Sequence, residues 1–284
     1  MSIRLENVSY VYNSGTSTET YGLKQVSFRV ERGEFLAIIG HTGSGKSTLI
    51  QQLNGLEKPT KGKVFFEEKD IWTKGYDLRA LRCKVGLVFQ YPEHQLFEET
   101  VLKDVCFGPL NKDLSHEEAR QKAINALELV GIPQELHHVS PFELSGGQKR
   151  KVAIAGILAM EPEFLILDEP TAGLDPKGRD QLLELLKKLH QEKGIGVVLV
   201  SHSMEDVAKY AERIVVMSHG EIAYDGTPVE VFSHSEQLGK LGLDVPVIFK
   251  LMHQLKQRGF QVDENIMEVE DAKNSIKNCL RHLD

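Results

Sequence analysis

The sequence predicts an α/β fold. Three short runs, at 35–39, 164–167 and 196–200, consist almost entirely of apolar residues, as strands do when helices cover both faces of a sheet. The first run leads through a glycine-rich turn into a helical segment at 48–56, and another helical segment lies between the other two runs. Strands that alternate with helices in this way are typical of α/β architecture.

The size and composition of the chain agree with such a fold. At 284 residues it can form one large domain, or one domain with an appendage. A hydrophobic content of 41% is sufficient for a core. The net charge of −7 argues against a generally basic face for nucleic acid.

Cysteines and apolar runs bear on the compartment. The three cysteines, Cys83, Cys106 and Cys279, lie far apart without metal-ligand spacing, which predicts reduced thiols in a cytosolic protein. The N-terminus lacks the apolar core of a signal peptide. No apolar run approaches the ~18 residues that span a bilayer. We therefore expect any role at a membrane to depend on partner proteins.

The N-terminal segment predicts two strands. Residues 3–12 follow a strand pattern, and a second strand-like segment at 23–30 comes after a polar loop. Tyr12, at the end of the first strand and ahead of the glycine-rich turn, could stack on a nucleobase because every base offers a π-face. A tyrosine packed at a strand end is the alternative interpretation.

The glycine-rich turn after the strand at 35–39 carries the pattern G-x-x-x-x-G-K-[ST], which predicts a phosphate-binding loop. Glycines let backbone N–H groups curl around a phosphate, and the positive end of the next helix faces the anion. Lys46 would reach the β- and γ-phosphates, and the Ser47 hydroxyl would ligate Mg²⁺. Nucleoside triphosphate contacts are expected from Gly40, His41, Thr42, Gly43, Ser44, Gly45, Lys46, Ser47 and Thr48.

A strand at 85–89 ends at Gln90, and a proline two residues later stops regular structure. A glutamine in this place could contact Mg²⁺ or the attacking water, although glutamines at strand ends are common. From 95 to 161 the pattern is helical. Ser115 opens a capping box there, and Gly131 ends that helix.

A second glycine-rich turn, Ser145-Gly146-Gly147-Gln148, precedes a helix-compatible run at 149–160. Because this turn has no lysine of its own, it is expected to complete an anion site rather than to found one. The basic trio at 149–151 would then lie in the first helical turn. It could be a solvated helix face, a contact near phosphates or, against the acidic balance of the chain, a nucleic-acid contact.

Two adjacent carboxylates follow the strand at 164–167, at the edge where open α/β sheets bind ligands. Asp168 would hold Mg²⁺ directly or through water, and Glu169 would orient and deprotonate the attacking water. A tight loop ends at Asp175, before a helix that begins at Pro176 and ends near Gly194. His202 follows the strand at 196–200 and could donate to a γ-phosphate oxygen; a packed or surface histidine is the alternative.

The character of the chain changes beyond about residue 232, after a predicted hairpin at 214–224. Residues 244–246 predict a helix start, and two apolar stripes at helical spacing follow. A helical pair of about 40 residues is too small to be stable alone, so it must pack on its own core or on another subunit. The stripes are Val245, Ile248, Phe249, Met252 and Leu255, and then Ile276, Leu280 and Leu283.

Together these stretches resemble the nucleotide-binding subunit of ATP-binding-cassette (ABC) transporters, whose motifs occur in order over residues 1–232. They are the A-loop (Tyr12), Walker A (40–48), the Q-loop (Gln90), the LSGGQ signature (144–148), Walker B with its glutamate (165–169), the D-loop (172–175) and the H-loop (His202). The resemblance implies a P-loop NTPase core (RecA-like) with an antiparallel β subdomain and an inserted α-helical subdomain at about 91–161. Residues 233–284 would form a small, mainly helical C-terminal extension with a dimer contact.

The resemblance also implies an ATPase that uses ATP and Mg²⁺ and acts as a head-to-tail dimer, in which each signature turn caps the ATP held by the other chain. The implied catalytic residues are Glu169, His202, Gln90 and Lys46. The implied Mg²⁺ ligands are Ser47, Gln90 and Asp168. Beyond the phosphate loop, nucleotide contacts are implied for Tyr12, Ser145, Gly146, Gly147, Gln148 and Asp175.

A narrower similarity, carried by residues 89–101, 152–156 and 159–179, is to the ATPases of energy-coupling factor (ECF) importers, and most to the second of their two ATPase subunits. It implies a peripheral protein on the cytoplasmic side of the cell membrane. Its partners would be a second ATPase subunit, a membrane-embedded scaffold protein contacted through residues 93–97, and membrane proteins that capture vitamins or transition-metal ions. A homodimer is the alternative to the heterodimer, and nucleic acid is not an expected partner.

Two other functions remain open at this stage. One is the ATPase of an ordinary ABC importer or exporter. The other is a soluble ABC clamp on nucleic acid, although such proteins usually carry long coiled-coil insertions or two cassettes in one chain.

Overall fold

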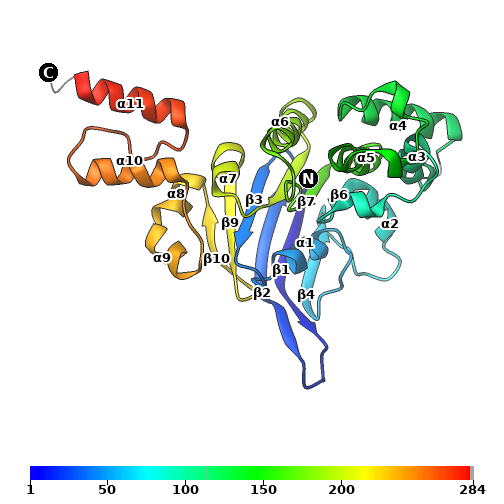
Figure 1. Cartoon of the computed structure of the whole chain (residues 1–284). Coiled ribbons are helices and arrows are strands. Elements are labelled where there is room, and N and C mark those ends of the chain that lie inside the picture. The colour runs from blue at the N-terminus through cyan, green and yellow to red at the C-terminus, as the bar shows by residue number, and fades with distance from the viewer. Residues whose placement is uncertain (113, 282–284) are drawn as a thin grey trace.

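The computed structural model describes residues 1–112 and 114–281 and is built around two sheets (Figure 1). The larger sheet has six strands in the order β10-β9-β3-β8-β7-β6. Neighbouring strands from β9 to β6 are parallel, and β10 pairs antiparallel with β9 as the predicted hairpin. The strands are β3 (Phe35–Gly40), β6 (Val85–Val88), β7 (Phe164–Asp168), β8 (Gly196–Val200), β9 (Arg213–Ser218) and β10 (Glu221–Gly226).

The smaller sheet is antiparallel and has the order β2-β1-β4-β5. Its strands are β1 (Ser2–Tyr12), β2 (Thr20–Glu31), β4 (Lys61–Phe66) and β5 (Lys69–Asp70). Helix α1 (Lys46–Leu53) packs with this sheet against one face of the larger sheet, where Leu36 and Ile38 of β3 are fully buried. The predicted mixture of a parallel α/β core and antiparallel strands is confirmed.

Helices on the other face of the larger sheet complete the main core. There β3 contributes Phe35, Ala37 and Ile39, so successive residues of this strand face opposite sides and all are buried. Figure 1 shows α3, α4 and α5 gathered beyond β6. The helices before the C-terminal segment, apart from α1, are α2 (Leu78–Lys84), α3 (Val101–Leu110), α4 (His116–Leu129), α5 (Gly146–Leu158), α6 (Pro176–Lys193) and α7 (Met204–Tyr210), with 3-10 turns η1 (Pro92–Gln95), η2 (Gln134–Leu136) and η3 (Pro141–Glu143).

Two helices differ from the prediction in their bounds, and α1 begins at Lys46 rather than at residue 48. Helix α1 ends at Leu53 rather than near residue 56, because Gly55 takes a left-handed φ of 66° that ends the helix. Helix α5 begins at Gly146 rather than at residue 149, because Ser145 and Gln148 form a capping box that includes both glycines in the first turn. The predicted capping box of Ser115 at the start of α4 is confirmed.

The C-terminal segment forms α8 (Pro228–Ser233), α9 (Ser235–Lys240), α10 (Val247–Gln257) and α11 (Val269–Arg281). Helices α10 and α11 share a small separate cluster centred on Met252, Ala272 and Cys279, while Phe249 joins the main core. Leu280, predicted to lie on the apolar stripe, is 51% exposed, and Leu283 lies outside the described residues. The segment therefore packs partly on its own chain and presents part of its second stripe to the surface.

Two further observations concern the cysteines and the hydropathy of the helices. Cys83, Cys106 and Cys279 are free thiols. No helix in the described part of the chain has the length and hydropathy that a membrane crossing requires.

Candidate functional site

The loop from Gly40 to Gly45 connects β3 to α1 in a tight turn. The Ser44 N–H donates to the His41 carbonyl at 3.1 Å. A Cβ atom at Gly40 would lie 2.4 Å from the Met217 carbonyl oxygen, and one at Gly45 would lie 2.4 Å from that of Gly22. Backbone from two other strands packs against the loop at these points, so only glycine fits. The loop is held in a shape that can curl around a phosphate.

Lys46 closes this loop on itself. Its Nζ donates to the carbonyl oxygens of Gly40 at 2.8 Å and His41 at 3.1 Å, and the residue is only 6% exposed. Burial lowers the pKa of Lys46, and the nearby carboxylates of Glu169 and Asp168 partly oppose that shift. An ammonium group in this position can exchange its carbonyl partners for phosphate oxygens.

Ser47 and Asp168 meet next to Lys46. The Ser47 hydroxyl donates to Asp168 Oδ2 at 3.0 Å, and Asp168 is 9% exposed. Burial raises the pKa of Asp168, while the hydrogen bond from Ser47 opposes this. A hydroxyl and a carboxylate are hard oxygen ligands, and Mg²⁺ usually takes only one or two protein groups and completes its shell with water and phosphate. The pair therefore fits Mg²⁺, and the described residues hold no cluster of three or more His, Cys, Asp or Glu that would form a cage without nucleotide.

Asp168→Asn is expected to raise the Tm of the ligand-free protein by a few degrees at neutral pH. Because the folded pKa of Asp168 lies above its unfolded value, the ionised carboxylate costs stability above the folded pKa, and this cost disappears below the unfolded pKa of about 3.9. The asparagine oxygen can still accept from Ser47. Thermal melts between about pH 4 and about pH 8 should show the gain shrinking toward acid, and Mg²⁺ should strengthen ATP binding less in the variant. A gain that does not depend on pH would contradict this explanation.

Glu169 forms the centre of a second group of side chains. Its Oε1 lies 2.7 Å from His202 Nε2, and its Oε2 accepts from Gln90 Nε2 at 3.3 Å. Glu169 has a φ of 47°, a left-handed conformation that is uncommon for a residue with a side chain and that occurs often at functional sites. The structure thus brings Gln90, Glu169 and His202 together. Gln90, which was also predicted as a Mg²⁺ ligand, contacts the Glu169 carboxylate rather than the Ser47–Asp168 pair.

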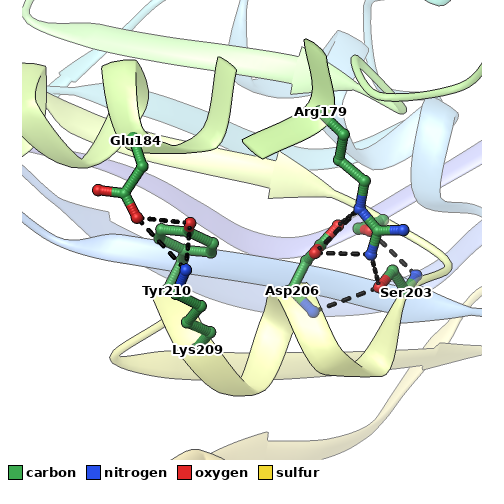
Figure 2. A network of polar contacts seen from close by, with 7 residues as sticks. Arg179, Glu184, Ser203, Asp206, Lys209 and Tyr210 are labelled. Atoms are coloured by element: carbon green, nitrogen blue, oxygen red, sulfur yellow. Dashed lines mark hydrogen bonds and ion pairs between the residues drawn. The ribbon is translucent and has the colours of Figure 1, made fainter. Parts of the chain in front are cut away.

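The position of His202 is supported by contacts between α6 and α7, which Figure 2 shows. Arg179 on α6 donates through Nε to both carboxylate oxygens of Asp206, at 2.8 and 3.1 Å, and also contacts the Ser203 hydroxyl. Ser203 follows His202 directly and caps α7 by accepting from the Asp206 N–H at 3.2 Å. The backbone next to His202 is therefore linked to α6 through two residues, Ser203 and Asp206.

Further along the same helix pair, Glu184 and Tyr210 make a second link (Figure 2). The Tyr210 hydroxyl donates to Glu184 at 2.8 Å and accepts from Lys209 at 2.9 Å. Two polar links about one helical turn apart hold α7 in a single orientation relative to α6.

Tyr12 lies against the start of α1. Its hydroxyl lies 2.8 Å from the Thr48 hydroxyl, and a Cβ atom at Gly22 would lie 2.7 Å from its ring. Tyr10 instead donates to Glu57 at 2.6 Å, and this hydrogen bond raises the pKa of Tyr10 to about 12. Of the two tyrosines, Tyr12 is the one next to the phosphate loop.

The second glycine turn, residues 145–148, forms a cap at the start of α5. Ser145 N donates to Gln148 Oε1 at 3.0 Å, and Ser145 Oγ accepts from the Gln148 N–H at 3.4 Å. The side chains of this cap thus bond to one another. Asp175 lines a cavity of about 240 Å³ together with the cap, and its Oδ1 accepts from the Gly178 N–H at 2.6 Å at the start of α6.

Residues 23–172 match the family model described as ABC transporter. The Energy-coupling factor transporter ATP-binding protein EcfA2 of Caldanaerobacter subterraneus subsp. tengcongensis is 55% identical over 99% of this chain and 98% of its own length. The protein of the same name from Clostridium tetani is 53% identical over 97% of this chain and 96% of its length. The chain belongs to the ATP-binding subunits of energy-coupling factor transporters.

Solved structures of ABC ATPases agree with the fold. CbiO1 from Clostridium perfringens, part of the ABC transporter complex cbiONQ, superposes with a TM-score of 0.74 at 41% identity, covering 88% of this chain and 98% of that one. The dimeric ATP-binding cassette MJ0796, in a post-hydrolysis state with ADP and Pi, gives a TM-score of 0.71 at 35% identity, covering 79% and 98%. The ECF subunit has the P-loop NTPase fold, binds ATP, and is an ATPase whose activity is coupled to transport.

One prediction about this ECF subunit needs correction. The basic trio at 149–151 was expected as a solvated face or a contact near phosphates, yet Arg150 is 3% exposed and donates to Glu93 on η1. The aliphatic pattern of α5 gives no sign of this burial, and the partner lies 57 residues away in the sequence.

The predicted scaffold contact at 93–97 is divided between a bonded and an exposed residue. Glu93 pairs with Arg150 inside its own chain, whereas Phe97 is 57% exposed.

Proposed function

We propose that this chain is the ATP-hydrolysing subunit of an ECF importer, and that it works in a head-to-tail dimer with a second ATPase subunit. The observation that carries the dimer is the cap at 145–148. A Cβ atom at Gly146 or Gly147 would meet nothing within 4 Å, and the capping hydrogen bonds are made within the turn. The outer side of the cap and the positive end of α5 are therefore free for a phosphate that another chain holds.

Each site residue then has a distinct task. The loop at 40–48 wraps the β- and γ-phosphates and Lys46 binds them, while Tyr12 stacks on the base. Ser47 and Asp168 would hold Mg²⁺, which neutralises phosphate charge when bound. Glu169 accepts the proton of the attacking water, Gln90 helps to place that water, and His202 donates to the γ-phosphate.

The dimer links this chemistry to movement. ATP joins the two chains because each triphosphate contacts the loop of one chain and the cap of the other. Hydrolysis removes the γ-phosphate contact and thereby favours separation, which is a population shift driven by the ligand. Asp175, which lines the same cavity as the cap, would lie at the contact between the chains.

The partners would place the chain at the cytoplasmic face of the cell membrane. They are the second ATPase, a membrane-embedded scaffold protein, and a membrane protein that captures vitamins or transition-metal ions. For the scaffold we favour a contact at Phe97 and Phe107, an exposed edge-to-face pair with ring centroids 5.0 Å apart. An exposed aromatic pair of this kind is typical of the anchors of protein interfaces.

Pull-down of the tagged chain from native membranes, followed by mass spectrometry of the intact complex, tests this function. We expect a second ATPase and a small membrane scaffold, and we expect Phe97→Ala to retain the ATPase partner but to lose at least half of the scaffold. Tyr21→Ala, which truncates another exposed aromatic on β2, is the matched control and should recover the full complex. A complex that lacks the second ATPase or the membrane scaffold would contradict the proposed assembly.

A further inference from the structure

Arg150 is a buried cation with an unusual set of partners. Its Nε and Nη2 donate to the two oxygens of Glu93 at 3.1 and 2.9 Å. Its Nη1 donates to the carbonyl oxygens of Pro170 at 3.0 Å and Ala172 at 2.7 Å. One guanidinium therefore joins three segments: helix α5, turn η1 after Gln90, and the loop that follows Glu169.

Two of these segments are also joined at the catalytic end. Gln90 donates to Glu169 at 3.3 Å, and a few residues further along both segments Arg150 bridges Glu93 to Pro170 and Ala172. The strip at 90–93 and the strip at 169–172 are thus linked twice, first by the reacting side chains and then by Arg150. A shift of either strip relative to the other must break or move the contacts of Arg150.

The chemistry of this contact favours arginine. The planar guanidinium donates in fixed directions to a carboxylate and to two carbonyl groups at once, whereas a lysine ammonium is a compact charge with three rotatable donors. Burial alone would raise the pKa of Glu93, but the hydrogen bonds and charge of Arg150 outweigh it and lower that pKa. Glu93 therefore stays ionised at neutral pH, and removing Arg150 would leave a largely buried carboxylate without its cation.

Helix α5 carries the effect to the cap. The Lys149 N–H donates to the Ser145 carbonyl at 2.9 Å, so the cap and Arg150 lie in one continuous helical segment. We propose that Arg150 is a positioning residue that couples the cap at 145–148 to Gln90 and Glu169 of the same chain. The inference rests on the proposed dimer, in which the cap contacts the ATP of the partner chain. Through Arg150, the position of the cap would depend on the positions of residues 90–93 and 169–172 in the same chain.

The test uses the assembled ATPase complex and the variants Arg150→Lys and Arg150→Gln. We expect kcat for ATP to fall about tenfold or more while the KM for ATP stays within about twofold. The KM should hold because the phosphate loop that binds the chain's own ATP is untouched. A fold-wide defect would instead lower the Tm and raise the KM together, and that outcome, like an unchanged kcat, would overturn the inference.

Two further variants distinguish loss of the Arg150–Glu93 link from a general loss of positive charge on α5. Lys149→Gln removes the neighbouring positive charge from the half-buried position next to Arg150 and should leave kcat near its normal value. Glu93→Gln combined with Arg150→Gln should cost no more than Arg150→Gln alone, since both changes break the same link. If Gly147→Asp abolishes turnover but the Arg150 variants do not, only this inference fails; if Gly147→Asp is also without effect, the proposed dimer fails.

Discussion

Glu169→Gln is expected to retain ATP binding and to lose most ATP turnover. The amide has the size of the carboxylate and can still meet His202 and Gln90, but it cannot accept a proton from water. Removing a general base typically costs about 10²- to 10⁴-fold in rate. Since the phosphate loop, Lys46 and Ser47 are unchanged, the ATP-bound dimer should accumulate. Steady-state ATPase assays and size-exclusion chromatography with and without ATP measure both effects.

Glu163→Gln is the matched control for this experiment. Glu163 immediately precedes β7, as Glu169 follows it, and it pairs with Lys84 at 3.2 Å at the other end of the strand. Its removal should leave turnover close to normal. Normal turnover in Glu169→Gln would remove Glu169 as the base and would leave His202 or the nucleotide itself to accept the proton.

Much of the site was predictable because its residues follow local patterns. Gly40, Asp168 and His202 each lie at or just after the carboxyl end of a buried strand. Parallel strands bring those ends to one edge, so a sequence that predicts the strands also predicts the meeting of the side chains. The same logic placed Ser47 beside Asp168, which are 121 residues apart in the chain.

Other features depend on contacts that no local pattern reveals. Arg150 and Glu93 are polar residues in segments of ordinary helical or turn character, and only the packing of α5 against η1 makes them a buried pair. The same holds for Arg179 and Asp206, which are 27 residues apart on α6 and α7. Polar side chains are usually exposed, so sequence reasoning places them on the surface by default.

One missed boundary did carry a local signal. Ser145 followed three residues later by Gln148 is a capping-box pattern, and it would have placed the start of α5 at Gly146. The glycines obscured this signal because glycine is a poor helix former. In the folded chain they lie in the first turn, where their N–H groups have no helical partner and can face an anion.

Gly147→Asp is expected to abolish ATP-dependent dimerisation and to reduce turnover by about 100-fold or more, as loss of a transition-state charge contact does. Because a side chain at this position meets nothing within 4 Å in its own chain, the isolated fold should tolerate the change. An acidic residue in the first turn of a helix is also favourable. The new carboxylate would, however, face the triphosphate of the partner chain and repel it. Equilibrium binding of a fluorescent ATP analogue should show that the chain's own site still binds nucleotide.

Gly156→Asp provides the comparison within the same helix. A Cβ atom at Gly156 would also meet nothing within 4 Å, but Gly156 lies on α5 well beyond the cap. This variant should dimerise with ATP and hydrolyse it at nearly the normal rate. Both variants should show a Tm within a few degrees of the unmodified protein. If Gly147→Asp hydrolyses ATP at full rate as a monomer, then one chain is sufficient for catalysis, and the open cap must serve some purpose other than closing a neighbour's nucleotide site.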